Sequence, residues 1–342
     1  MTNTTPETLR VQPDEMRQLF YEILLRRNVP DERARKCADV FTENSADGVL
    51  SHGVNRFNRF VTLIDKRVID ALAEARCVKQ VGALEQWHGH NGLGIINALA
   101  ATNRAMDLAS VHGLGCVALG FTNHWMRAGT YARQAALKGF AFMAWSNTIR
   151  NTPAWGAIDP RLGNNPLTVG IPNGNMPVVL DMAMSQFSYG ALEAYKIQSE
   201  TLPVYGGYDA HGKLTLNPAD IIESRRTLPI GYWKGAGLSL LLDMLGAILS
   251  GGLSVSEVSK QEEEKNLTQV FIAFNLKSLK NFTSIQSTLT QIIADFKQAT
   301  PEHEGRPVRY PGESVLARRQ KSYTDGIEVN RKKWMEILSL AR

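Results

Sequence analysis

The stretch Ser51–Arg56 (SHGVNR) carries the side chains best suited to chemistry in this chain. Ser51 is a favourable N-cap for a helix, on which His52 and Arg56 would lie about 40° apart at the rim of the buried face. A histidine titrates near neutral pH, so it can protonate the alkoxide that forms when a carbonyl is reduced. An arginine can hold a carboxylate through two parallel hydrogen bonds. The pattern predicts a site for an anionic carbonyl compound; the alternative is an exposed histidine and arginine at a helix start.

A second histidine, His124, follows the apolar run Leu114 to Leu119, which has the length of a strand. Loops that lead from a strand into a helix often carry ligand-binding groups in α/β proteins. His124 is therefore a second candidate for substrate contact, although a loop histidine fixed by hydrogen bonds would give the same pattern. His88 and His90 flank a glycine and have no acidic partner in register, so no metal site is expected.

Three further positions could contact a ligand. Asp181 ends the apolar run 178–180, where a carboxylate is costly unless it is paired, for example by orienting a histidine. Trp233 and Lys234 open an apolar helix, from which the lysine could reach a phosphate or ribose or simply extend along the surface. The segment 155–166 is rich in amides and turn formers, and is either a plain loop or a cradle for ligand hydroxyls.

Composition indicates a globular protein of one or two domains, since the 342 residues are 44% hydrophobic and 21% charged. No segment offers the roughly 18 uncharged apolar residues of a membrane span. The richest apolar run, Leu238 to Leu249, contains Asp243 and is predicted to be a buried helix. The N-terminus lacks the basic and apolar pattern of a secretion signal, so a cytoplasmic location is expected.

Cysteine usage and charge narrow the class further. Cys37, Cys77 and Cys116 lie far apart among apolar neighbours and are predicted to be buried thiols in a reducing compartment, not disulfides or zinc ligands. The formal net charge of +5 is modest. No basic stripe with interleaved aromatic residues is present, so nucleic-acid binding is not expected.

Hydrophobic spacing predicts helices over the first 75 residues and an α/β alternation after them. Strands are predicted at 114–119, 140–145, 167–171, 178–182 and 270–274, and helices at 95–112, 126–138, 188–199, 234–250 and 283–298. The segment 205–218 is typical of a hairpin, and the chain returns to helix from about 313. The glycine-rich dinucleotide fingerprint G-x-G-x-x-G does not follow any predicted strand, so a Rossmann domain is not predicted.

The same residues resemble the malate/L-lactate dehydrogenase type-2 family. The similarity runs in colinear order through SHGVNRF (51–57), NHWMRAGTY (123–131), NNPLTVGIP (164–172), VVLDMAMSQFSYG (178–190), LPIGYWKGAGLSLLLDM (228–244) and YPGES (310–314). It implies an α/β (α+β) fold with a helical domain built from both chain ends, residues 1–75 and 313–342. Residues 76–312 would form a larger mixed-sheet domain that binds NAD(H) without a Rossmann fold. The resemblance also implies a homodimer with the active site near the subunit interface.

Carried over residue by residue, the resemblance makes His52 the proton donor, Ser51 and Arg56 its substrate-facing partners, and His124 the second pocket histidine. NADH is the implied cofactor, with NADPH as the alternative. The implied cofactor contacts are Pro177, Val178, Val179, Leu180, Asp181, Met182, Ala183, Trp233, Lys234, Gly312, Glu313 and Ser314.

Departures from the family pattern bear on the substrate. Asn164 stands where many relatives have threonine, and Gly190-Ala191 where many lactate and malate enzymes have Gly-Lys. The versions at 187–190 and 231–234 are similar to the branch that reduces 2,3-diketo-L-gulonate to 3-dehydro-L-gulonate, although Ser314 replaces an acidic residue expected there. That small anionic keto acid is the expected substrate. The alternatives are malate, lactate, ureidoglycolate or a cyclic imino acid, or a non-redox sugar-acid binder or isomerase.

Overall fold

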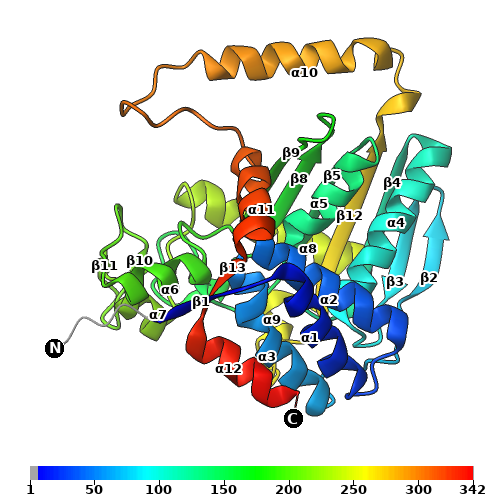
Figure 1. Ribbon diagram of the computed structural model, residues 1–342. Coiled ribbons are helices and arrows are strands. Elements are labelled where there is room, and N and C mark those ends of the chain that lie inside the picture. Colours follow the sequence, from blue (N-terminus) through cyan, green and yellow to red (C-terminus); the bar gives the residue numbers. More distant parts are fainter. Residues whose placement is uncertain (1–6, 342) are drawn as a thin grey trace.

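A computed structural model describes residues 7–341 of the chain (Figure 1). Its centre is a seven-stranded mixed sheet in which β3 and β4 are the one parallel pair and all other neighbours are antiparallel. The mixed α/β class expected from the sequence is confirmed. In spatial order the strands are β2 (Arg76–Val81), β3 (Leu84–His88), β4 (Leu114–Thr122), β12 (Leu267–Asn275), β5 (Phe140–Ser146), β8 (Leu167–Ile171) and β9 (Val178–Met182).

Helices cover both faces of this sheet because successive side chains of a strand point to opposite sides. Val117 and Leu119 of β4 pack with α4 (Gly94–His112) and α5 (Ala128–Leu137) on one face. Cys116 and Ala118 of the same strand pack on the other face, together with Leu242 of α8 (Trp233–Ser250). The two layers hold the loops at the strand ends in fixed positions.

A helical part packs beside the sheet and contains both ends of the described chain. It consists of α1 (Pro13–Leu25), α2 (Asp31–Ala46), the short 3-10 helix η1 (Leu50–His52), α3 (Val54–Asp65) and α12 (Arg331–Leu340). Strand β1 (Thr8–Val11) pairs antiparallel with β13 (Ile327–Asn330). Phe20 of α1 is fully buried and stacks on Phe57 of α3, with ring centroids 3.9 Å apart. This aromatic core fixes α3, which follows the Ser51–His52 segment.

The remaining elements lie around the sheet. A small cluster of Leu192, Leu202 and Ile221 joins α6 (Tyr189–Gln198) and α7 (Pro218–Ser224), next to the hairpin β10 (Gly207–Tyr208)–β11 (Leu214–Thr215). Two short strands, β6 (Thr152–Pro153) and β7 (Pro160–Leu162), pair with each other, and α9 (Val255–Val258) follows α8. The 3-10 helix η2 (Leu276–Ser278) leads into α10 (Phe282–Lys297), and α11 (Glu313–Asp325) precedes β13.

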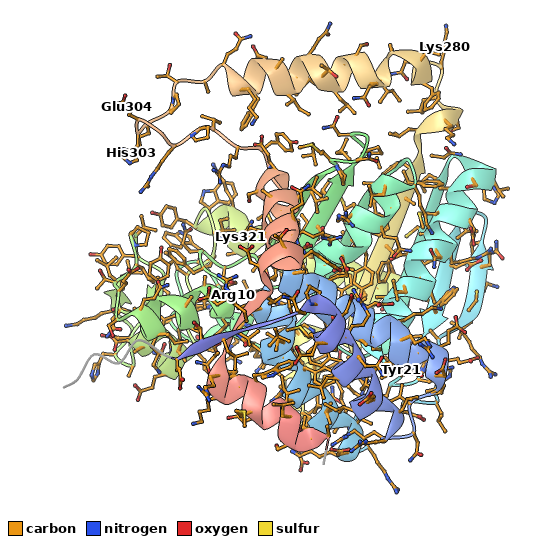
Figure 2. All side chains as sticks on the ribbon, viewed as in Figure 1. Arg10, Tyr21, Lys280, His303, Glu304 and Lys321 are labelled. Atoms are coloured by element: carbon orange, nitrogen blue, oxygen red, sulfur yellow. The ribbon has the colours of Figure 1, made fainter. Side chains whose placement is uncertain are left out.

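Helix α10 stands apart from the rest of the molecule. None of its residues is buried, and its side chains project on all sides between Lys280 and the following loop with His303 and Glu304 (Figure 2). Phe282, Ile292 and Phe296 are among its exposed apolar residues. Its contacts with the rest of the described chain include a hydrogen bond from Gln286 to Asn173 and an ion pair of Lys297 with Glu313, and they leave its apolar side chains uncovered.

The predicted strands and helices between residues 95 and 298 are confirmed to within a few residues, as is the hairpin in 205–218. Two predictions about burial are wrong. Cys77 is exposed, because β2 is an edge strand whose residues are all exposed; Cys37 and Cys116 are buried as expected. Helix α8 is apolar but not buried all round: Leu242 packs on the sheet, whereas Ile248 is 72% exposed.

Helix α8 is also long and apolar enough to cross a membrane, judged by length and composition alone, which was not predicted from the sequence. It has this composition although it contains Lys234 and Asp243. Asp243 accepts hydrogen bonds from the Asn147 amide and the Val255 backbone N–H. A helix that covers one face of a sheet gives the same composition signal, so this property carries no conclusion about a membrane.

The aromatic core under α3 predicts a large stability effect at Phe20. Replacing Phe20 by Ala should lower the free energy of unfolding by about 3–5 kcal/mol, because it leaves a cavity between α1 and α3. Urea unfolding followed by circular dichroism measures this value. The control is Leu72→Ala, at a side chain that is 66% exposed, where a change of about 0.5 kcal/mol or less is expected. Equal effects of the two substitutions would contradict the role of Phe20.

Candidate active site

The predicted motif Ser51–Arg56 does not start as one helix. Ser51 and His52 end η1, and the chain then turns at Gly53 (φ −115°, ψ −126°), which is the residue that precedes α3. Ser51 makes no side-chain cap for α3, so that prediction is wrong. A Cβ at Gly53 would lie 2.2 Å from the Ser45 hydroxyl oxygen, so close packing against α2 dictates the turn. The Asn44 amide donates to the His52 carbonyl over 3.0 Å and holds the motif from the same helix.

The structure brings the two predicted histidines together. The rings of His52 and His124 are nearly parallel, with centroids 5.8 Å apart. The backbone N–H of Met126 donates to Nδ1 of His124 over 3.0 Å, so the neutral ring of His124 carries its proton on Nε2. The Ser51 hydroxyl lies 3.1 Å from Nδ1 of His52. Both rings are thus oriented by neighbours on their Nδ1 side.

Burial keeps both imidazoles neutral. It lowers the pKa of His52 to about 3, helped by His124, Arg56 and Arg127 and opposed by Glu264. Burial also lowers the pKa of His124 to about 3, helped by Arg56 and Arg59. A charged imidazole loses its water and meets neighbouring cations, so both effects act in the same direction. An anion bound among these cations would reverse part of the shift.

A cavity of about 300 Å³ opens beside His124 and is called here the histidine cavity. Its polar wall holds Arg56 and Glu264, whose Nη2 and Oε2 atoms are 3.4 Å apart. The full lining is Arg56, Arg59, Phe60, Leu63, Ile69, Asn123, His124, Met126 and Glu264. Arg56 therefore reaches the same space as His124, as the sequence suggested, while Glu264 was not predicted.

Ser51 meets a segment far away in the sequence. A Cβ at Gly190 of α6 would lie 2.6 Å from the Ser51 Cβ and 2.7 Å from its hydroxyl oxygen. The glycine noted in the sequence is thus required for α6 to approach the motif. This contact places the 185–190 loop at the edge of the site.

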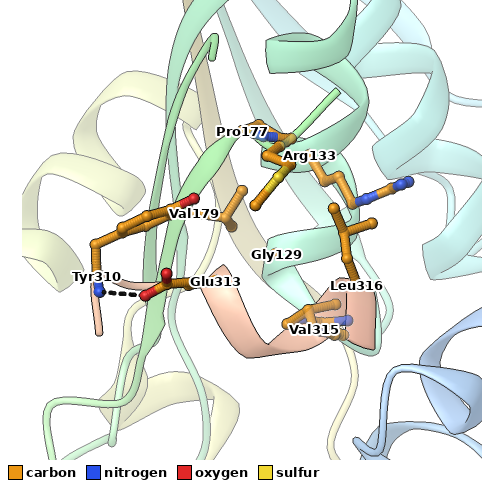
Figure 3. A pocket seen from close by; sticks show the side chains of 11 residues that line it. Gly129, Arg133, Pro177, Val179, Tyr310, Glu313, Val315 and Leu316 are labelled. Carbon is orange, nitrogen blue, oxygen red and sulfur yellow. Dashed lines mark hydrogen bonds between the residues drawn. The ribbon is translucent and has the colours of Figure 1, made fainter. Parts of the chain in front are cut away.

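A second cavity, of about 370 Å³, lies where two of the predicted cofactor segments meet. The backbone N–H of Val179 in β9 donates to the Pro311 carbonyl over 3.1 Å, and Gly312 (φ 87°) packs on Val179 at the start of α11. Tyr310 and Glu313 stand on one side of this cavity and Arg133 and Leu316 on the other (Figure 3). It is called here the β9–α11 cavity, and its lining is Arg127, Gly129, Arg133, Met176, Pro177, Val179, Tyr310, Gly312, Glu313, Val315 and Leu316. Trp233 and Lys234 are not part of this lining and are exposed at the start of α8.

The chemistry of the β9–α11 cavity fits a nicotinamide dinucleotide. Pro177, Val179 and the Tyr310 ring offer apolar surface to a planar ring. The first residues of α5 and α11 line the cavity, and the N-termini of helices favour phosphate groups. Arg133 is half-buried here, and within residues 7–341 no carboxylate forms an ion pair with it. A phosphate could supply the missing negative partner.

Asp181 has a different partner from the one proposed from the sequence. Its carboxylate accepts the Gly129 N–H over 2.9 Å and lies 3.5 Å from Nε of Arg127, not beside a histidine. Arg127 also pairs with Asp47, which in turn binds Arg319 of α11 over 2.7 Å. Burial raises the pKa of Asp181, and Arg127 opposes that shift. This network, in which Asp47 and Arg127 are largely buried, joins the end of α2 to β9 and α11, and Arg127 lies on the loop that carries His124.

Sequence reasoning missed Arg127, Arg133 and Glu264 as site residues. Arg127 lies in the quoted motif NHWMRAGTY, three residues after His124, and that proximity was the available signal. Glu264 belongs to an acidic run, EEE at 262–264, which is typical of a solvated surface. Arg127 and Glu264 are recognised by their partners in space, and Arg133 by the cavity that it lines.

Comparison with known proteins identifies the class. The sequence model of the malate/L-lactate dehydrogenase family matches residues 11–338. The 2,3-diketo-L-gulonate reductase of Klebsiella pneumoniae is 41% identical over 333 residues, which are 97% of this chain and 100% of that protein. The protein of the same name from Salmonella typhimurium is 40% identical with the same coverage.

Solved structures agree on the fold. A sulfolactate dehydrogenase from Methanocaldococcus jannaschii has a TM-score of 0.89 and 26% identity, over 97% of this chain and 96% of that one. A malate dehydrogenase from Entamoeba histolytica has a TM-score of 0.92 at 23% identity, over 98% of each chain. The chain is an oxidoreductase that acts on CH–OH and C=O groups. It belongs to the malate/L-lactate dehydrogenase family, which indicates a nicotinamide cofactor and is consistent with a small keto acid as substrate.

The lowered histidine pKa values predict an unusual titration. Neither His52 nor His124 should protonate above about pH 4 in the ligand-free protein, because both rings are buried beside cations. Two-dimensional ¹H–¹⁵N spectra of the imidazoles report this directly.

The lowered pKa values of His52 and His124 also predict how the free energy of unfolding changes with pH. The unfolded chain binds protons on these rings near the ordinary pKa of 6.5 and the folded chain does not. The free energy of unfolding should therefore decrease as the pH falls below about 6.5. Titration of either ring near pH 6.5 in the folded protein would contradict the burial argument.

Proposed function

We propose that the protein reduces 2,3-diketo-L-gulonate to 3-dehydro-L-gulonate with a nicotinamide dinucleotide bound in the β9–α11 cavity. The observation that carries this proposal is that His124 and Arg56 line one cavity while the His52 ring lies parallel to that of His124, with centroids 5.8 Å apart. The naming of relatives at about 40% identity over nearly the whole chain supports the substrate.

The bound cofactor would supply the hydride. The chain's own residues then have three tasks at the C2 carbonyl. Arg56 holds the substrate carboxylate, because the sole partner of its guanidinium among residues 7–341 is Glu264 at 3.4 Å. Ser51 and His124 bind substrate oxygens. His52 gives its proton to the oxygen that becomes a hydroxyl.

The neutral resting state of His52 fits this task. The pKa of His52 is about 3, lowered by burial and, more weakly, by Arg56 among other neighbours. A carboxylate placed on Arg56 cancels part of that positive potential, so the His52 pKa rises as the substrate binds. The acid is therefore generated together with the bound anion, close to the carbonyl that needs the proton.

The wider assignments belong to the same proposal. A homodimer is supported by two exposed apolar surfaces, Leu241 and Ile248 of α8 and the exposed apolar side chains of α10, which a second copy would cover. The helical domain of 1–75 and 313–342, the 76–312 domain, NADH as preferred cofactor and a cytoplasmic location remain predictions from the resemblance.

The first experiment follows the absorbance of NADH, and separately NADPH, during incubation with freshly made 2,3-diketo-L-gulonate. Pyruvate, oxaloacetate, ureidoglycolate in the oxidative direction and a cyclic imine serve as the comparison panel. Turnover chiefly on the diketo acid supports the proposed substrate. Turnover chiefly on another compound would replace the substrate and keep the site. Absence of NADH and NADPH binding, measured by nicotinamide fluorescence, would favour a sugar-acid binder or an isomerase.

Replacing His52 by Ala should lower kcat by about 10²–10⁴-fold, because the general acid is lost. NADH should still bind with a similar Kd, since the β9–α11 cavity does not include His52. Steady-state kinetics and fluorescence titration measure the two effects. A near-normal kcat would remove His52 from the role of proton donor.

Replacing Arg56 by Ala should chiefly raise KM for the keto acid, because the carboxylate loses a charged partner. An increase of about 10-fold or more is expected if the lost contact is worth 1.5–3 kcal/mol. The matched control is Arg67→Ala, at an exposed arginine just after α3. An unchanged KM in the Arg56 variant would assign the substrate carboxylate to another residue.

A further inference from the structure

Glu264 is the only carboxylate that lines the histidine cavity within the described residues 7–341. Its side chain is 12% exposed and lies just before β12, on the wall that also holds Arg56. One oxygen, Oε2, faces Nη2 of Arg56 over 3.4 Å, which is long for an arginine–carboxylate contact. No hydrogen bond to the other oxygen, Oε1, occurs among the residues that the structure describes. Glu264 thus presents an acceptor that is mostly withdrawn from water.

The other charged side chains around the cavity already have close partners of opposite charge. The second cation in the lining, Arg59, bonds to Glu263 over 3.2 Å, and Glu263 also binds Lys66 over 2.8 Å. This leaves Arg56 to receive an anion from a ligand, with Glu264 beside it. The cavity therefore suits a molecule that has one carboxylate and, further along its carbon chain, hydroxyl groups that donate hydrogen bonds.

We propose that Glu264 is a specificity-determining residue that accepts hydrogen bonds from the hydroxyl groups of the substrate's carbon chain and excludes a second carboxylate. The inference rests on the proposed function, because it concerns the 2-oxo acid that this site reduces. It selects hydroxylated monocarboxylates over dicarboxylates such as oxaloacetate and over short apolar keto acids such as pyruvate.

Two physical effects produce this selection. A hydroxyl that donates to a carboxylate forms a short, charge-assisted bond, whereas a methyl group in its place leaves one oxygen of the Glu264 carboxylate without a hydrogen-bond donor. A substrate carboxylate in the same place meets the like charge of Glu264 at close range. Sites built to bond a substrate hydroxyl reject analogues that lack it strongly, so one residue is enough to sort these substrates.

The test is Glu264→Gln, which keeps the shape of the side chain and removes its charge. The matched control is Glu262→Gln, two positions earlier in the same acidic run, at an exposed side chain. Both variants and the wild-type protein are assayed with NADH on 2,3-diketo-L-gulonate, oxaloacetate and pyruvate. Thermal unfolding and NADH titration show that fold and cofactor binding are intact.

For Glu264→Gln, the ratio of kcat/KM for the diketo acid to that for oxaloacetate should fall by about 10-fold or more. The change should lie mainly in KM, because the contact is made away from the reacting carbonyl. Glu262→Gln should leave the ratio unchanged. An unchanged ratio in the Glu264 variant, or an equal loss of kcat on all three substrates, would overturn the proposal.

Failure of the proposed function can be told apart from failure of this inference. If the wild-type protein turns over none of the 2-oxo acids, the proposed function fails, and the role of Glu264 is read from binding. Calorimetry then compares L-gulonate, a hydroxylated monocarboxylate, with L-malate. Tighter binding of L-gulonate that Glu264→Gln removes supports the role of Glu264. Equal binding of the two acids by the wild-type protein overturns it.

Discussion

Both cavities depend on the ion pairs that Arg127 forms with two carboxylates. Its guanidinium lies between the carboxylates of Asp47 and Asp181, which come from α2 and β9. Asp47 extends the connection to Arg319 of α11. A buried charge that loses its partner costs several kcal/mol, so these groups hold one another in place. The network fixes the loop of His124 relative to the helix that closes the β9–α11 cavity, and in that way sets the distance between the histidine cavity and the β9–α11 cavity.

The second constraint is the burial of the His52 and His124 rings, which removes water from around them. Two largely buried imidazoles share their surroundings with Arg56, so both rings are neutral, with one proton each, while the site lacks an anion. In the proposed mechanism, the negative charge of the substrate favours the second proton on His52, and Arg56 both binds the carboxylate and controls this protonation. A neutral ligand in the site would leave His52 in its neutral form.

Sequence patterns predicted the elements of the α/β part well, because apolar runs of strand length alternate with helical patterns, some of which end at a glycine. Gly113 and Gly251 take the left-handed conformation at the ends of α4 and α8. Strand β2 escaped prediction since all its residues are exposed and no apolar alternation marks it. Strands β1 and β13 escaped because their pairing joins residues more than 300 positions apart, and no local pattern encodes that contact.

The candidate site, too, was predicted only in part from the sequence. His52, Arg56 and His124 were found from residue type and position, since a histidine and an arginine close in sequence are visible without a structure. The geometry between them was not, because Gly53 breaks the helix that was expected to carry both. Arg127 and Glu264 belong to the site through partners that are 80 and 208 positions away in the sequence. Their charges, taken singly, are typical of a solvated surface.

The pairing of β1 with β13 has a consequence for how the protein is made. The core around Phe20 also contains Trp334 and Ile337 of α12, which are synthesised after the whole sheet. During synthesis, α1 to α3 therefore wait with part of their apolar surface uncovered while the sheet forms behind them. The motif that carries His52 is thus translated early, but the core that supports it closes only after α12 has been made.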